Sequence, residues 1–118
     1  SAIDSVEQYT YDIGMEQMAT DKMRIHATAY NIQIIGEAVY NLTKDFKESR
    51  QSTPWSQIEK MRHILVHHYF AVDFDVLWSV VTEDIPVLKR QIEKYVEELW
   101  KRTSANLYNQ INRRYQCW

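Results

Sequence analysis

Residues that interrupt helices are scarce in this chain, whose 118 residues include only two glycines and two prolines. Glycine destabilises the interior of a helix and proline removes one of its hydrogen bonds, so long stretches without either favour helices over many short strands. Apolar residues make up 45% of the chain, which is enough for the core of one domain of this length. The sequence therefore predicts an all-α fold.

Apolar residues recur at spacings of three and four along four segments, which is the pattern of helices with one buried face. Short polar stretches separate these segments. Four amphipathic helices with short connections indicate an antiparallel up-and-down four-helix bundle. The expected helices are 3–13, 22–46, 54–70 and 76–99, and the expected connectors are 15–20, 47–53 and 71–74.

Local signals mark the ends of these helices. Gly14 is expected to stop the first helix, because glycine readily takes the left-handed conformation found at helix ends. Pro54 suits the first turn of the third helix, where a missing N–H costs little. Pro86 falls inside the fourth helix and is expected to kink it. Residues that can cap a helix N-terminus precede the later helices: Thr20 or Asp21, Ser52 or Thr53, and Asp73 or Asp75.

The second helix carries a wide apolar face. This width suggests burial against the rest of the bundle on one side and against a second molecule on the other. Trp55, Trp78 and Trp100 also fall on apolar stripes, so we expect them in the core. The main stripe of the second helix is Met23, Ala27, Tyr30, Ile34, Ala38 and Leu42, with Ile32, Ile35 and Val39 beside it.

Charge is distributed unevenly along the chain, which has a formal net charge of −2. All 16 acidic residues precede Leu99, whereas four of the 14 basic residues follow it. The body therefore lacks the basic surplus of a general polyanion binder, and contact with nucleic acid would need a local patch. The single cysteine, Cys117, suits a reducing compartment, and no apolar run approaches the roughly 20 residues of a membrane helix. We expect a cytoplasmic protein.

The helical domain is expected over residues 1–102, and residues 103–118 differ from it in kind. This C-terminal extension is rich in Asn, Tyr and Arg, with scattered apolar residues. Its interleaved aromatic and basic residues are typical of single-strand binders. Packing on a neighbour is the preferred interpretation. A fifth short helix, a docking tail and sequence added during cloning all remain open.

Residues 62–69 gather groups that can act on a phosphodiester, namely Arg62, His63, His67 and Tyr69. Arginine offers a rigid fork of donors to phosphate oxygens, and histidine titrates near neutrality and can remove or supply a proton. In RNA the 2′-hydroxyl is an internal nucleophile, so these groups suffice for cleavage without a metal. On an ideal helix Arg62 and His67 lie about 140° apart. Either the helix distorts near His67, or a two-fold-related copy completes the site.

Two other interpretations of this segment stay open. In the first, Arg62 is a surface cation paired with Glu59 or another acidic neighbour, and His67 is a satisfied core residue. His63 and His67 also have the spacing of a helical metal pair, and His26 would then have to supply another ligand. No HExxH pattern or nearby cysteine supports a metal site, so we expect neither a metal nor another cofactor.

The order of residues resembles the Rx4HxY motif of HEPN-domain proteins, with Arg62, His67 and Tyr69 at the motif positions. His63, directly after the arginine, is one of the polar residues that this family accepts there. The resemblance runs over about residues 3–100. Three further segments are similar to those of the HepT-like branch and occur in the same order: Ile34-Ile35-Gly36-Glu37-Ala38, Pro54-Trp55 and Asp84-Ile85-Pro86.

The resemblance implies a homodimeric helical bundle that acts as a metal-independent endoribonuclease toxin, with its site in a cleft between protomers. Arg62 would bind and stabilise the phosphate, His67 would act as general base or acid, and His63 would assist. The expected partners are a nucleotidyltransferase antitoxin of the MNT type and an RNA substrate, for which tRNA and mRNA are both candidates. Tyr69 would receive an inactivating AMP from the antitoxin.

Gly36 and Glu37 lie inside the second expected helix. A glycine there is best explained by the close approach of another backbone. Glu37 is either a solvated residue or a buried partner of Arg62 or His63, since an unpaired buried carboxylate would be costly. An alternative function is a non-catalytic subunit that binds a nucleotide or a nucleotidyltransferase, which the net acidic body favours.

Overall fold

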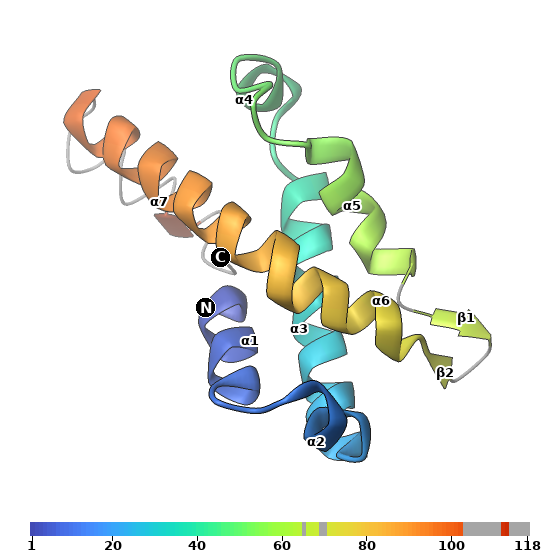
Figure 1. Ribbon diagram of the computed structural model, residues 1–118. Coiled ribbons are helices and arrows are strands. Elements are labelled where there is room, and N and C mark those ends of the chain that lie inside the picture. The colour runs from blue at the N-terminus through green and yellow to red at the C-terminus, as the bar shows by residue number, and fades with distance from the viewer. Residues whose placement is uncertain (65, 69–70, 103–111, 114–118) are drawn as a thin grey trace.

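A computed structural model describes residues 1–64, 66–68, 71–102 and 112–113, and the side chains of residues 64–71 lie outside this description. The described part is mostly helical, which confirms the all-α class (Figure 1). The antiparallel up-and-down arrangement of four helices stays a prediction. The elements are α1 (Ala2–Thr10), α2 (Met15–Ala19), α3 (Lys22–Tyr40), α4 (Lys44–Glu48), α5 (Trp55–Ile64), β1 (Val66–His68), β2 (Ala71–Val72), α6 (Phe74–Ser79), the π-helix η1 (Val80–Asp84) and α7 (Ile85–Arg102).

The first helix ends earlier than the sequence predicts. α1 stops at Thr10, and Asp12 rather than Gly14 takes a positive φ, of 50°. Aspartate tolerates this region because its short side chain can hydrogen-bond locally. Gly14 has an ordinary φ of −78° and precedes α2, so its expected role as a helix stop is wrong. The expected turn at 15–20 is largely helical, and Met18 anchors it in the core.

The second expected helix is two helices. α3 begins where Asp21 accepts a hydrogen bond from the Arg24 N–H, which confirms one of the predicted caps. It ends at Tyr40 instead of continuing to residue 46. Thr43 then starts α4 by accepting a hydrogen bond from the Phe46 N–H at 3.2 Å. A threonine hydroxyl that caps a new N-terminus competes with continuation of the first helix, which explains the break.

The buried face of α3 differs from the predicted stripe. Met23 is 85% exposed and Tyr30 is 64% exposed, so the first half of that stripe faces away from the core. The buried face is rotated towards smaller and β-branched residues, and these permit close contact with α1 and α5. Its members are Ile25, Thr28, Ala29, Ile32, Ile35, Gly36, Ala38 and Val39.

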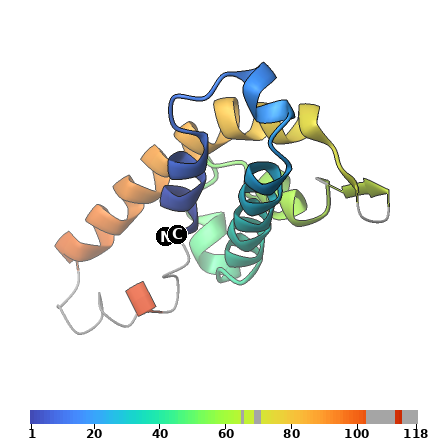
Figure 2. The same cartoon turned by 90° about the horizontal axis from the view of Figure 1, so that it is seen from below.

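The third helix also ends early. α5 stops at Ile64, whereas the sequence predicted helix up to residue 70. The chain then forms β1, which pairs antiparallel with β2 in the expected connector, with Val66 opposite Val72. β-Branched valines favour extended backbone, so this apolar run suits a strand as well as a helix. The two-stranded sheet of β1 and β2 projects from the helices, at the end of the molecule opposite the last turn of α7 (Figure 2).

The last helical stretch is continuous from residue 74 to residue 102 but changes its hydrogen bonding before Pro86. Asp73 caps α6 as predicted by accepting a bond from the Val76 N–H. In η1 the Ile85 N–H donates to the carbonyl of Val80, five residues earlier. A wider turn relieves the clash between a proline ring and the carbonyl four residues before it. Pro86 is therefore accommodated by a π-helical turn, and the kink expected at this proline stays a prediction.

Aromatic side chains close one end of the core. Trp55 and Tyr95 are buried, with ring centroids 6.0 Å apart, and Thr53 bonds the Tyr95 hydroxyl rather than capping α5. Trp78 is half-buried and stacks on Phe74, whereas Trp100 is half exposed, so its expected place in the core is wrong. Within the described residues, none of the helices combines the length and apolar character needed to cross a membrane.

Candidate functional site

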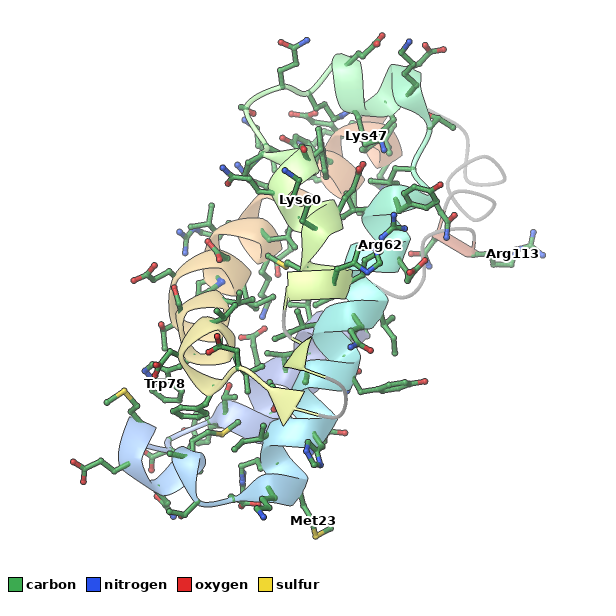
Figure 3. All side chains as sticks on the ribbon, turned by 90° about the vertical axis from the view of Figure 1, so that its right-hand side faces the viewer. Met23, Lys47, Lys60, Arg62, Trp78 and Arg113 are labelled. Carbon is green, nitrogen blue, oxygen red and sulfur yellow. The ribbon has the colours of Figure 1, made fainter. Side chains whose placement is uncertain are left out.

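Arg62 reaches the surface of α3 because Gly36 lets two backbones meet. A Cβ at Gly36 would lie 2.9 Å from the Arg62 backbone nitrogen and 3.1 Å from the Arg62 Cβ. The first distance is shorter than real Cβ contacts and the second is tight, so a side chain at Gly36 would require the Arg62 backbone to shift. The expected close approach at Gly36 is confirmed. The last turn of α5 therefore sits directly on α3, and the Arg62 side chain lies across it (Figure 3).

Three neighbours hold the Arg62 guanidinium in place. Its Cζ lies 3.9 Å from the centroid of the Tyr40 ring, which is a cation–π contact. Its Nη1 lies 3.8 Å from Oε1 of Glu37. Its Nε donates a hydrogen bond of 3.0 Å to Nε2 of His63. Tyr40 contacts the face of the guanidinium, Glu37 lies near one terminal nitrogen, and His63 is bound to Nε. The guanidinium has therefore lost much of its rotational freedom before any ligand binds.

The hydrogen bond between Arg62 and His63 joins two neighbouring side chains at the end of α5. Nε2 of His63 accepts this bond, as an imidazole nitrogen without a proton can. A proton on Nε2 would remove the bond and place two cations side by side. The contact with Arg62 therefore fits an assisting role for His63 better than metal binding.

Glu37 proves to be an exposed partner of Arg62. The Glu37 side chain is 58% exposed and that of Arg62 is 21% exposed. Ion pairs at such exposure contribute only about 0–1 kcal/mol to stability. The Glu37 carboxylate therefore contributes little to the stability of the fold. Its main effect is electrostatic, because it offsets the positive charge of Arg62 that a bound phosphate would contact.

A cavity of about 330 Å³ opens beside the guanidinium, between α3 and the end of α5. Its lining is mostly apolar and also carries a cation, a carboxylate, a phenol and two amides. This mixture of apolar surface and a few polar groups is typical of a ligand site. The lining residues are Tyr30, Gln33, Ile34, Glu37, Ala38, Asn41 and Arg62.

The structure does not bring all the predicted residues together. His67 belongs to β1, so the separation of about 140° expected on one helix no longer applies. The helix distortion that we considered near His67 is present as this strand. The side chain of His67 lies outside the described part of the chain, and so does Tyr69. Their relation to Arg62 stays a prediction.

Tyr40 is a site residue that the sequence did not reveal. It lies four residues after Gly36, one turn further along the face of α3 that receives Arg62. The signal was available in principle, since residues four apart share a helix face. It could be interpreted only after the contact between Gly36 and Arg62 was known, because a cation–π pair leaves no mark in local sequence.

The metal interpretation gains no support from the described residues. His26 is exposed on α3, ten residues before Gly36, and is therefore about 15 Å away along the helix axis. His63 follows Arg62, which contacts Gly36, and is therefore far from His26. Among the residues that the structure describes, no three His, Cys, Asp or Glu side chains gather as a metal site would need.

Comparison with known proteins identifies the class. A family model described as Ribonuclease HepT-like matches residues 1–95, which is most of the chain. The chain therefore belongs to the HepT-like ribonuclease family, and the resemblance seen in its motifs is confirmed.

Individual relatives carry ribonuclease names. Over 93 residues the chain is 43% identical to "Probable ribonuclease HepT" of Thermococcus cleftensis, covering 79% of the chain and 84% of that protein. It is 38% identical over the same length to a "Putative RNase" of Methanocaldococcus jannaschii, with the same coverage. A third relative, "Gamma-glutamylcyclotransferase and putative RNase" of the same organism, is 42% identical over 92% of the chain, which spans 48% of that protein. No solved structure matches the chain.

Proposed function

We propose that this protein is a metal-independent endoribonuclease that uses Arg62 and His67 of its Rx4HxY motif. The observation that carries the proposal is the guanidinium of Arg62, held by Tyr40, Glu37 and His63 at the wall of a cavity. Family membership and the ribonuclease names of the relatives support RNA as the substrate. A cation fixed beside an open cavity is suited to binding a phosphate.

The proposed reaction needs only groups of the protein and the RNA. His67 takes the proton of the 2′-hydroxyl, and the 2′-oxygen attacks the adjacent phosphorus. The bond from phosphorus to the 5′-oxygen breaks, and this oxygen leaves with a proton from an imidazolium. The products are a 2′,3′-cyclic phosphate and a 5′-hydroxyl. Arg62 donates to the phosphate oxygens, whose negative charge must be stabilised in the transition state.

A second copy of the chain would complete this site. Large side chains on α3 stand outside the core of the single chain, with Met23 85% and Tyr40 53% exposed. Exposed apolar and aromatic surface of this kind favours an interface between copies. In a two-fold dimer the same patch meets itself, so each motif would be repeated across one cleft. The imidazolium that protonates the leaving oxygen would then be His67 of either protomer.

The toxin role and its control extend the proposal. The HepT-like resemblance supports a toxin–antitoxin pair in the cytoplasm, with a nucleotidyltransferase of the MNT type as antitoxin. Transfer of AMP to Tyr69 would add bulk and negative charge near Arg62 and would block the phosphate site. Incubation with such an enzyme and ATP, followed by peptide mass mapping, tests this step. A mass gain at any other residue would contradict it.

Cleavage of total RNA and tRNA by the purified protein, with and without EDTA, tests the nuclease. We expect cleavage that EDTA leaves unchanged and that Arg62→Ala and His67→Ala abolish. Arg90→Ala is the matched control, because Arg90 is exposed on α7 and outside the cavity. A folded protein that binds RNA or a nucleotidyltransferase but cleaves nothing would favour the alternative, a non-catalytic binding subunit. The acidic body of the chain is the observation that keeps this alternative open.

A further inference from the structure

The cavity beside Arg62 has more polar groups than phosphate binding requires. Arg62 uses Nε for His63, and its terminal nitrogens make no hydrogen bond to the described residues. A phosphate on these nitrogens would place an attached sugar and base within reach of the cavity of about 330 Å³. The rest of the cavity wall should then contact that nucleoside rather than solvent alone.

Two amides on the cavity wall have unused hydrogen-bonding groups. Gln33 is half-buried and Asn41 is exposed where α3 ends. In the described part of the chain, neither side-chain amide is hydrogen-bonded; at Asn41 only the backbone N–H is engaged, with the Glu37 and Val39 carbonyls. Each amide offers both donors and an acceptor, which is the set needed to pair with the edge of a base.

An aromatic ring stands at the same wall. Tyr30 is 64% exposed although its ring is large and mostly apolar. It lies one turn before Gln33 and Ile34 on the same face of α3. Proteins that bind single-stranded RNA stack unpaired bases on exposed aromatic rings of this kind.

We propose that this cavity is a nucleoside subsite for single-stranded RNA, next to the phosphate bound by Arg62. Tyr30 stacks on the base and Gln33, three residues further along α3, pairs with its edge. Asn41, about 12 Å beyond Gln33 along the helix axis, contacts the sugar-phosphate backbone beside Arg62. The inference rests on the proposed ribonuclease function and adds its substrate class, an unpaired nucleotide flanking the cut. Because Gln33 contacts the base edge, cleavage is selective at that position.

The competing occupant is a second copy of the chain, which the exposed Tyr30 could also contact. The polar wall favours the nucleoside. A protein neighbour that covered the Arg62 guanidinium and the two amides would displace their bound water. These groups would then need matched hydrogen-bond partners on that neighbour. A nucleotide supplies a phosphate, hydroxyls and a base edge together. The oligomeric state of the variants separates the two occupants.

Cleavage of a short RNA library with randomised positions, read by sequencing the new ends, tests the subsite. Tyr30→Ala, Gln33→Ala and Asn41→Ala should each raise KM, and the changes at Tyr30 and Gln33 should also flatten the base preference at one position beside the cut. For Tyr30→Ala the rise should be about 5- to 100-fold, the range expected for loss of one stacked base. Tyr11→Ala and Gln17→Ala are matched controls, since both residues are exposed outside the cavity, and they should behave as the wild type.

The outcomes separate this proposal from the nuclease itself. Unchanged KM and base preference in active variants would overturn the subsite and leave the nuclease standing. A change from dimer to monomer with unchanged binding of uncleavable RNA would assign the wall to a second copy and also overturn it. Binding of a labelled 2′-O-methyl RNA, which cannot be cleaved, decides the matter if the wild type proves inactive. Weaker binding by Tyr30→Ala and Asn41→Ala supports the subsite, and equal or absent binding contradicts it.

Discussion

Gly36 of α3 and Arg62 of α5 touch through their backbones, with only 2.9 Å between the Arg62 nitrogen and the position of a Cβ at Gly36. This contact joins the packing of the fold to the site. It sets the distance between the two helices, and it decides where the Arg62 guanidinium can lie on α3. A change at Gly36 should therefore be felt both in stability and in activity.

Gly36→Ala should destabilise the protein although alanine favours helix. The added methyl overlaps the Arg62 backbone, and overpacking of this kind costs about 1–3 kcal/mol. The better helix propensity of alanine returns only about 1 kcal/mol. Urea unfolding should therefore show a lower free energy of unfolding, and RNA cleavage should fall as Arg62 is displaced.

Gly14→Ala is the matched control for that change. A Cβ at Gly14 would meet nothing within 4 Å, and its φ of −78° suits any residue. We expect unchanged activity and equal or slightly higher stability, because alanine lowers the entropy of the unfolded chain. Equal behaviour of the two variants would show that the contact between α3 and α5 yields easily.

Tyr40 should act on the reaction through Arg62. The ring lies 3.9 Å from the guanidinium carbon, and such contacts are worth about 0.5–1 kcal/mol when exposed. Tyr40→Phe keeps the ring and should retain most cleavage activity, whereas Tyr40→Leu should lower kcat several-fold. Tyr11→Leu is the control. Equal kcat for the Phe and Leu variants would show that the ring does not position the cation.

Glu37→Gln should strengthen RNA binding by the free protein. The carboxylate is 3.8 Å from Nη1 of Arg62 and competes with an incoming phosphate. Removing its charge should lower the Kd for uncleavable RNA by up to about fivefold, which corresponds to an exposed ion pair. Glu16→Gln, an exposed change on α2, should have no effect. Weaker binding by Glu37→Gln would instead mean that Glu37 orients Arg62 for its ligand.

Asp84 should make stability depend on pH. Burial raises the pKa of Asp84 above its ordinary value of 3.8, and the neighbouring Glu83 carboxylate adds to the rise. The folded state then binds the proton more tightly than the unfolded state. The free energy of unfolding therefore falls as pH rises from about 3.8 through the higher folded-state pKa. Asp84→Asn should be more stable than the wild type at pH 7 and should lose that advantage in acid, and a difference that is constant with pH would contradict this.

The sequence predicted those parts of the fold that local chemistry controls. Asp21 and Asp73 cap the helices that follow them, because an N-cap needs only a side-chain oxygen and the next turn. α3 begins at Lys22 as expected, whereas α6 begins at Phe74, two residues before the expected start. The break after Tyr40 escaped prediction, since the apolar spacing continues to Leu42 and the cap at Thr43 looks like any threonine. β1 escaped it because a short apolar run fits a strand as well as a helix.

The site could be predicted only in part for a similar reason. Arg62 and Glu37 were recognisable as candidates from their motifs, and they do meet. Tyr40 and the amides of the cavity are joined to Arg62 by tertiary packing, which no spacing along the chain encodes. The exposure of Met23 and Tyr30 was missed because a wide apolar stripe does not show which half faces the core.

The chemical ends of the RNA products test the central claim most directly. Digestion of a defined RNA in the presence of EDTA, followed by mass spectrometry of the fragments, identifies both termini. The account predicts a 2′,3′-cyclic phosphate and a 5′-hydroxyl from the wild type and Arg90→Ala, and no fragments from Arg62→Ala. Fragments with a 5′-phosphate and a 3′-hydroxyl, or cleavage that EDTA abolishes, would contradict it.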